Sequence, residues 1–106
     1  EYLRGYGLKL IQCNYQCRVG EIDLIMIDSC RVLVFVEVRF RRSGRFGTAI
    51  DSITREKQRK IRRTASHFLI SYPQFSNRIC RFDVIGISPS QLSGGLHYEW
   101  IKSAFE

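Results

Sequence analysis

Two apolar runs of this chain each contain a pair of charged residues spaced two positions apart. Glu21 and Asp23 open a run rich in Ile, and Glu37 and Arg39 lie within a later run rich in Val and Phe. Because side chains alternate along a strand, the two members of each pair share one face. A charge on a buried strand costs free energy unless something compensates it. Either Glu37 simply pairs with a cation such as Arg39, or the strand is the wall of an active site; we favour the active site.

Carboxylates at this spacing match the ligands of a hard divalent cation. Mg²⁺, or Mn²⁺ in its place, typically takes one or two protein carboxylates and fills its remaining positions with water and phosphate oxygens. A metal held in this way could activate a water molecule and neutralise the charge that builds up on a phosphate during in-line displacement. The metal ligands that we predict are Glu21, Asp23, Glu37 and the main-chain carbonyl of Val38.

The register of the two strands decides whether these acids meet. If the connection has an odd number of residues, for example 29–31, then Asp23 lies opposite Glu37, with Cβ atoms about 4.5–5.5 Å apart. A two-residue turn would put the two carboxylates on opposite faces of the sheet. No Asn-Gly or Asp-Gly pair demands such a tight turn here. The constellation is therefore permitted, and it depends on the register.

The positive charge of the chain is concentrated in one segment. The formal net charge is +7, and residues 39–63 alone hold ten basic groups against two acidic ones. Such clustering is typical of a protein that binds a polyanion, although a solvated surface helix has the same composition. We therefore predict a nucleic-acid partner, in the first place DNA. The candidate nucleic-acid contacts are Arg41, Arg42, Arg45, Arg55, Arg59, Arg62 and Arg63.

A helix is predicted to follow the basic loop and to lie beside the acids. Thr54 is a good N-cap for a helix over residues 55–71, which Pro73 ends. Lys57 and Gln58 fall on the buried side of this helix, where a lysine either snorkels to solvent or points at an anion at the edge of the sheet. The predicted buried stripe consists of Ile61, Ala65, Phe68, Leu69 and Tyr72.

Alternating and helical patterns predict one α/β domain over residues 1–106, built around a mixed sheet. A strand after the helix is expected to enter the sheet beside the central strand by a right-handed crossover. The helices are expected over residues 1–6 and 55–71, the strands over residues 8–13, 21–28, 32–41, 78–88 and 97–101, and a tail or helix stub over residues 102–106.

Several classes of protein find no support in the sequence. The four cysteines form neither a CxxC pair nor a zinc set with His67 and His97, so reduced thiols in a cytoplasmic protein are expected. No run is long and apolar enough to span a membrane, and no signal-peptide pattern opens the chain. Nucleophile-elbow, Walker and dinucleotide-binding motifs are absent as well.

The motifs resemble those of the PD-(D/E)XK nuclease superfamily, whose restriction-endonuclease-like core runs αβββαβ. The segments at 20–25 (GEIDLI), 34–39 (VFVEVR), 57–58 and 81–84 (RFDV) are similar to those of the uncharacterised bacterial YraN family. This resemblance covers nearly the whole chain. It implies a three-layer sandwich, Mg²⁺ binding at Asp23 and Glu37, and a relation to archaeal-type Holliday-junction resolvases.

Two features depart from the pattern of that family. Its strand motif ends Glu-x-Lys, whereas this chain has Arg39, which stays protonated and cannot accept a proton from water. Its upstream helix carries a Gly-Glu pair that would precede residue 1, so we expect a truncated N-terminal helix. The predicted catalytic residues are Asp23, Glu37, the phosphate clamp Arg39, and Lys57 and Gln58 at the border of the site.

Three functions remain open at this stage. The leading hypothesis is a Mg²⁺-dependent deoxyribonuclease, a hydrolase that acts on branched or damaged DNA. The alternative is a catalytically inactive nucleic-acid-binding module of the same fold, in which Arg39 pairs permanently with Glu37. A third is an interaction domain whose basic helix meets an acidic protein. A homodimer also stays open, since such dimers are common and no residue marks an interface.

Overall fold

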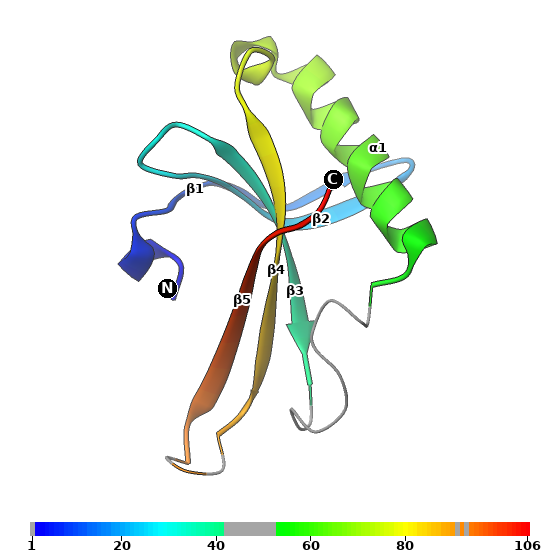
Figure 1. Cartoon of the computed structure of the whole chain (residues 1–106). Coiled ribbons are helices and arrows are strands. Elements are labelled where there is room, and N and C mark those ends of the chain that lie inside the picture. Colours follow the sequence, from blue (N-terminus) through cyan, green and yellow to red (C-terminus); the bar gives the residue numbers. More distant parts are fainter. Residues whose placement is uncertain (1, 42–52, 91, 93) are drawn as a thin grey trace.

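Within residues 2–41, 53–90, 92 and 94–106, which the computed structural model describes, one α-helix packs across a five-stranded mixed sheet (Figure 1). The strands lie in the sheet in the order in which they follow along the chain. The elements are η1 (Arg4–Tyr6), β1 (Lys9–Cys17), β2 (Gly20–Ile27), β3 (Leu33–Phe40), α1 (Arg55–Ser71), η3 (Pro73–Phe75), β4 (Cys80–Pro89) and β5 (Leu96–Phe105).

The pairing of the strands confirms the expected α/β class with a mixed sheet. Antiparallel pairs join β1 to β2, β2 to β3 and β4 to β5, whereas β3 and β4 are parallel neighbours with α1 between them in the chain. A parallel pair needs such a crossover, because a short turn cannot return the chain to the same end of the sheet. The central position of β3 explains its apolar composition, since both of its faces are covered.

Helix α1 forms over the range that its N-cap and helical periodicity predict. Thr54 Oγ1 accepts the N–H group of Lys57 at 3.1 Å, which satisfies one of the free donors in the first turn. Ile61, Ala65 and Phe68 are buried, as predicted. Thr64, which the stripe omitted, is also buried, and its hydroxyl donates to the carbonyl of Lys60 at 2.8 Å. The prediction for Tyr72 was wrong: it lies beyond the last turn and is 37% exposed.

Both edge strands are longer than their patterns suggest. The first strand was expected over residues 8–13 but continues to Cys17, with a bulge near Leu10, a positive φ of 52° at Asn14 and Tyr15 buried. The last strand continues to Phe105 instead of ending in a tail. The aromatic ring of Phe105 packs on Phe82 of β4, with ring centroids 5.1 Å apart.

The sheet has an apolar core on each face. On one face the ring of Phe35 meets those of Phe68 from α1 and Phe82 from β4, at centroid distances of 6.0 Å and 5.5 Å. On the other face the N-terminal segment packs through Leu3 and Leu8 on strands β2 to β4. Helix α1 covers the half of the sheet formed by β1 to β3, as Figure 1 shows. Tyr15 on β1 forms a hydrogen bond with His67 on α1.

The N-terminal segment differs from the expected helix tail. Residues 4–6 form a single 3₁₀ turn, and Gly7 ends it with a φ of 89°, a conformation that suits glycine. A helical layer on this face, which a three-layer sandwich requires, is not seen in the described residues. The restriction-endonuclease-like layout therefore stays a prediction.

Two further observations concern the cysteines and the length of the helices. Cys13, Cys17, Cys30 and Cys80 are free thiols. Within the described part of the chain, none of the helices has the length and apolar character needed to cross a lipid bilayer.

Candidate active site

The register between β2 and β3 brings the two central acids together. Leu24 pairs with Val36 in an antiparallel ladder. The next pair in this register is Asp23 with Glu37, and the connecting segment 28–32 has an odd number of residues, as the hypothesis required. Directly opposed residues on neighbouring strands point to the same face. The predicted register is confirmed, and both carboxyls lie on the side of the sheet that α1 covers.

Asp28 holds the turn that sets this register. Its Oδ1 atom accepts the N–H groups of Cys30 at 2.9 Å and of Val32 at 2.8 Å. Arg31 takes a left-handed conformation, with a φ of 67°, and donates its own N–H to the carbonyl of Asp28 at 3.0 Å. An aspartate side chain that bonds the backbone of the following residues favours a tight turn. The register of the site therefore depends on a turn residue five positions away from Asp23.

Glu37 is the most deeply buried of the predicted site residues, with 6% of its surface exposed. The pKa of its carboxyl is raised from 4.5 to about 7, chiefly by burial and then by a hydrogen bond to Asp23 and by the charge of Asp23. The cations Lys57 and Arg39 act in the opposite direction and are the weaker influence. The pair therefore favours a state in which one carboxyl carries a proton and donates it to the other.

Two cations reach the same oxygen of Glu37 from different elements. Arg39, two positions further along β3, places its Nη2 atom 3.2 Å from Glu37 Oε2. Lys57, in the first turn of α1, places its Nζ atom 3.6 Å from the same oxygen. The buried Nε–H of Arg39 has no hydrogen-bond partner among the described residues. Of the two alternatives for Lys57, the structure shows the one in which it points at an anion at the sheet.

Asp23 is held in place by the backbone of the neighbouring strand. Its Oδ2 atom accepts the N–H group of Val38 at 2.8 Å. A Mg²⁺ ion needs only one or two protein carboxylates, since waters and phosphate oxygens complete its shell. Asp23 and Glu37, with the carbonyl of Val38, fit that modest demand, whereas they would not form an all-protein cage for Ca²⁺.

Glu21 lies apart from the other two acids. Its side chain is exposed, and its Oε2 atom accepts the amide N–H of Gln16 at 3.2 Å. In the described residues no three His, Cys, Asp or Glu side chains are grouped so that they could hold a metal ion. A role for Glu21 as a third metal ligand therefore stays a prediction.

The remaining predicted site residues are dispersed. Gln58 donates its side-chain amide to the carbonyl of Ile53 at 3.3 Å and so ties down the segment before α1. Arg62 donates to the carbonyl of Glu106 at 2.9 Å. Arg55, Arg59 and Arg63 are exposed on α1, Arg41 is half-buried after β3, and Arg42 and Arg45 lie outside the described residues.

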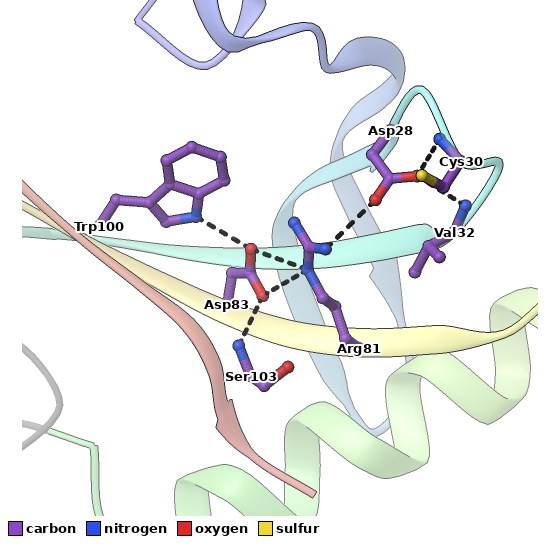
Figure 2. Close-up of polar contacts among 7 residues, drawn as sticks. All are labelled: Asp28, Cys30, Val32, Arg81, Asp83, Trp100 and Ser103. Atoms are coloured by element: carbon purple, nitrogen blue, oxygen red, sulfur yellow. Dashed lines mark hydrogen bonds and ion pairs between the residues drawn. The ribbon is translucent and has the colours of Figure 1, made fainter.

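A polar network that the sequence reasoning missed lies on the opposite face of the sheet (Figure 2). Asp83 is 1% exposed and accepts hydrogen bonds from Arg81 Nε, from Trp100 Nε1 at 2.9 Å and from the N–H of Ser103 at 3.0 Å. Arg81 also reaches Asp28 Oδ2 at 3.2 Å. The Arg-x-Asp spacing on β4 was the available signal. Both oxygens of Asp83 are occupied, so this carboxylate is a structural link and no candidate ligand.

The fold and the site together define a mixed-sheet α/β domain in which two carboxyls, one of them buried, lie beside two cations. The chain belongs to the uncharacterised protein family UPF0102, whose sequence profile matches residues 1–87. This finding confirms the resemblance to the YraN-like proteins.

Curated relatives carry the same family name. The UPF0102 protein of Nitrosococcus oceani is 51% identical over 104 residues, which cover 98% of this chain and 82% of that protein. The UPF0102 protein of Alcanivorax borkumensis is 44% identical over 105 residues, covering 99% of this chain and 82% of the relative. Among solved structures, Pyrococcus furiosus SfsA in complex with Ca²⁺ matches with a TM-score of 0.33 and 12% identity, over 91% of this chain and 54% of that one. A TM-score this low carries no argument about fold or site.

Proposed function

We propose that this protein is a Mg²⁺-dependent endonuclease-like enzyme that binds DNA and hydrolyses its phosphodiester bonds, with branched or damaged duplexes as the substrates that the family resemblance implies. One observation carries the proposal. Asp23 and Glu37 lie opposite each other on adjoining strands, Arg39 and Lys57 both contact the buried carboxyl of Glu37, and the pKa of Glu37 is raised. Acids with perturbed pKa values beside cations are typical of functional sites, although structural ion pairs produce them too.

The restriction-endonuclease-like fold belongs to the same proposal. The described order of three antiparallel strands, α1 and a parallel strand agrees with the βββαβ part of that core. In this layout the acid pair lies on the central strands beneath the N-terminal turn of α1. The four free thiols fit a reducing compartment, and we place the activity in the cytoplasm.

Each residue of the site would have its own role in the reaction. Asp23, Glu37 and the carbonyl of Val38 would hold Mg²⁺, which when bound supplies a Lewis acid for the phosphate and a water molecule of lowered pKa. Arg39 keeps its Nη2 on Glu37, and its guanidinium would place a positive charge beside a phosphate bound at the carboxyl pair. Arginine does not exchange protons, whereas the ammonium group of a lysine can donate one. We therefore assign proton transfer to the leaving oxygen to Lys57.

The same ion pairs favour a second candidate function. Arg39 and Lys57 both contact Oε2 of Glu37, so they can neutralise this carboxylate without any metal. A protein in which these contacts are permanent would keep the basic helix and bind nucleic acid without cleaving it. The two candidates differ in one measurable property, which is carboxylate-dependent binding of a divalent metal.

The test compares Asp23→Asn and Glu37→Gln with the wild type in Mg²⁺-dependent cleavage of a four-way junction and a plain duplex. Both changes remove a metal ligand, so cleavage should be abolished, while DNA affinity measured in EDTA should stay near the wild-type value. Glu56→Gln, an exposed acid in the first turn of α1, serves as the matched control.

Cleavage that survives both changes would contradict the assigned site. If the wild type binds DNA but neither cleaves it nor binds Mg²⁺ in a calorimetric titration, the protein is the inactive binding module.

A further inference from the structure

A polar cleft lies between the tip of the β1–β2 hairpin and the first two turns of α1. Its cavity volume is about 390 Å³, and its polar lining consists of Gln16, Glu21, Lys57 and Lys60. Cavities of this size are sufficient for a group as large as a nucleotide. The predicted site includes Lys57 and Glu21 but neither Lys60 nor Gln16, so the cleft introduces new residues.

A close approach of backbone to helix forms one wall of the cleft. A Cβ atom on Gly20 would lie 3.1 Å from Thr64 Oγ1 and 3.9 Å from Lys60 Cβ. A side chain at residue 20 would push Thr64 away by a few tenths of an ångström, so glycine favours this close approach of the hairpin to α1. Figure 1 shows this hairpin passing beside the helix. The contact fixes the side of α1 that carries Lys60 next to the turn between β1 and β2.

The cleft adjoins the carboxyl pair through a shared residue. Lys57 lines the cleft, and its Nζ atom is 3.6 Å from Oε2 of Glu37. Lys60 lies three residues further along α1, which corresponds to a rise of about 4.5 Å. Successive phosphates of one DNA strand advance about 3.4 Å along the duplex axis. Residues three positions apart lie next to each other on one face of a helix, so Lys57 and Lys60 can contact neighbouring phosphates of one strand.

The charges in the cleft select the kind of phosphate. Lys60 has no ion-pair partner among the described residues, and its ammonium is exposed. Glu21 is engaged by Gln16 through a hydrogen bond of 3.2 Å. Lys57 is already paired with Glu37, so the lining of the cleft offers a ligand the single positive charge of Lys60. That charge matches a phosphodiester, which carries one negative charge, better than a terminal phosphate monoester, which carries nearly two.

From this geometry we infer that the cleft binds the phosphodiester group next to the one that is cleaved, with Lys60 as its principal contact. The inference rests on the proposed function, since it assumes that a DNA strand passes the carboxyl pair. It adds the direction of that strand, which runs from Glu37 along the first turns of α1 towards the β1–β2 turn. It also makes an internal phosphate, not a free end, the preferred ligand.

The test measures the binding of short duplexes in EDTA, so that cleavage plays no part. One phosphate at a time is replaced by an uncharged methylphosphonate. In the wild type, one substitution next to the scissile position should weaken binding roughly five- to tenfold, and Lys60→Gln should weaken binding of unmodified DNA by the same factor and reduce the salt slope by about one ion. In Lys60→Gln that methylphosphonate should have no further effect.

Two controls make the outcome decisive. Lys9→Gln removes the same charge from the opposite end of β1 and should leave the methylphosphonate profile unchanged. Adding a terminal 5′-phosphate should not improve binding in the wild type. If Lys60→Gln behaves like Lys9→Gln while the wild type still binds and cleaves DNA, only the cleft assignment is wrong. If the wild type binds no DNA, both the assignment and the proposed function are wrong.

Discussion

At the scale of single residues, Glu37 is the point where opposing electrostatic effects meet. Burial and Asp23 favour its neutral form, whereas Arg39 and Lys57 favour its anion. The neutral form prevails up to a pH of about 7, the pKa of the carboxyl in the folded protein. A carboxyl in this state binds a divalent cation only with release of a proton. The site is therefore sensitive to pH near neutrality.

We predict that the stability of the metal-free protein falls as pH rises from about 4.5 to about 7. In the folded state the pKa of Glu37 is raised from 4.5 to about 7, so its contribution is fully present below 4.5 and is lost as pH passes through 7. The loss reaches at most about 3 kcal/mol. Glu37→Gln carries no titrating group and should gain stability over the wild type with rising pH.

Urea unfolding in EDTA at pH 5, 6.5 and 8 measures this difference. If the difference in unfolding free energy between the wild type and Glu37→Gln is the same at all three pH values, the raised pKa is contradicted.

Arg39 permits a second prediction at this scale. Lysine at this position keeps a positive charge beside Glu37 but, unlike arginine, can exchange a proton. If Arg39 is a weakened catalytic position, Arg39→Lys should raise the rate of Mg²⁺-dependent cleavage by roughly a hundredfold, the lower end of what a positioned proton-transfer group contributes. Arg39→Gln is the matched variant without charge, and it should lower both cleavage and DNA affinity. An equal loss of cleavage in both variants would show that the guanidinium itself is required.

At the scale of elements, one turn, one helix N-cap and one side-chain network fix the positions of the site residues. The turn at Asp28 sets the register of β2 and β3, and the N-cap at Thr54 sets the first turn of α1, from which Lys57 reaches Glu37. Asp28 also forms an ion pair with Nη1 of Arg81, and the Nε–H of Arg81 donates a hydrogen bond to Asp83. The register of the acid pair is thus linked through side chains to β4 and β5, although the network lies on the other face of the sheet.

Trp100→Phe tests the contribution of this network to stability. The change keeps an aromatic ring but removes the donor to Asp83 Oδ2, and it leaves part of a buried carboxylate unsatisfied. We expect a loss of about 1–3 kcal/mol in the free energy of unfolding. Chemical unfolding measures the loss, and Tyr98→Phe is a control on the same strand. Cleavage per folded molecule should not change, and a specific loss of activity would contradict a purely structural role.

At the scale of the whole molecule, the carboxyl pair and the exposed arginines of α1 lie at different depths. Glu37 is buried and Asp23 half-buried on the side of the sheet that α1 covers, while Arg55, Arg59 and Arg63 lie exposed on that helix. A polyanion that reaches the acids therefore meets this positive surface first. Attraction to phosphates of this kind does not depend on base sequence and weakens steeply with salt.

Reversing Arg59 and Arg63 to Glu should weaken DNA binding by a similar factor for all sequences. Each contact with a phosphate releases about one counterion, so the slope of log affinity against log salt should fall by about two units. Fluorescence anisotropy at several salt concentrations measures both quantities. Arg62 is left unchanged, because its contact with the carbonyl of Glu106 would mix a stability effect into the result. Strong sequence selectivity of the loss would contradict a role in binding the DNA backbone.

The sequence alone was sufficient for the elements with strong local signals. Helix α1, its N-cap and the apolar central strand follow from local hydrogen bonding and periodicity, which act within a few residues. The same reasoning failed for β1 and β5, where a bulge and residues with positive φ interrupt the alternation, and it missed the Asp83 network, whose members lie on different strands.

Only the tertiary structure decided which side chains meet. Whether Asp23 faces Glu37 depends on the length of one turn, because a shift by one residue would send the two carboxyls to opposite faces. The contact between Lys57 and Glu37, the separation of Glu21 from the pair and the cleft beside Lys60 depend on how α1 packs across the sheet. Residue types and spacing determined what chemistry was available to this chain, and long-range packing determined which of those groups stand close enough to act together.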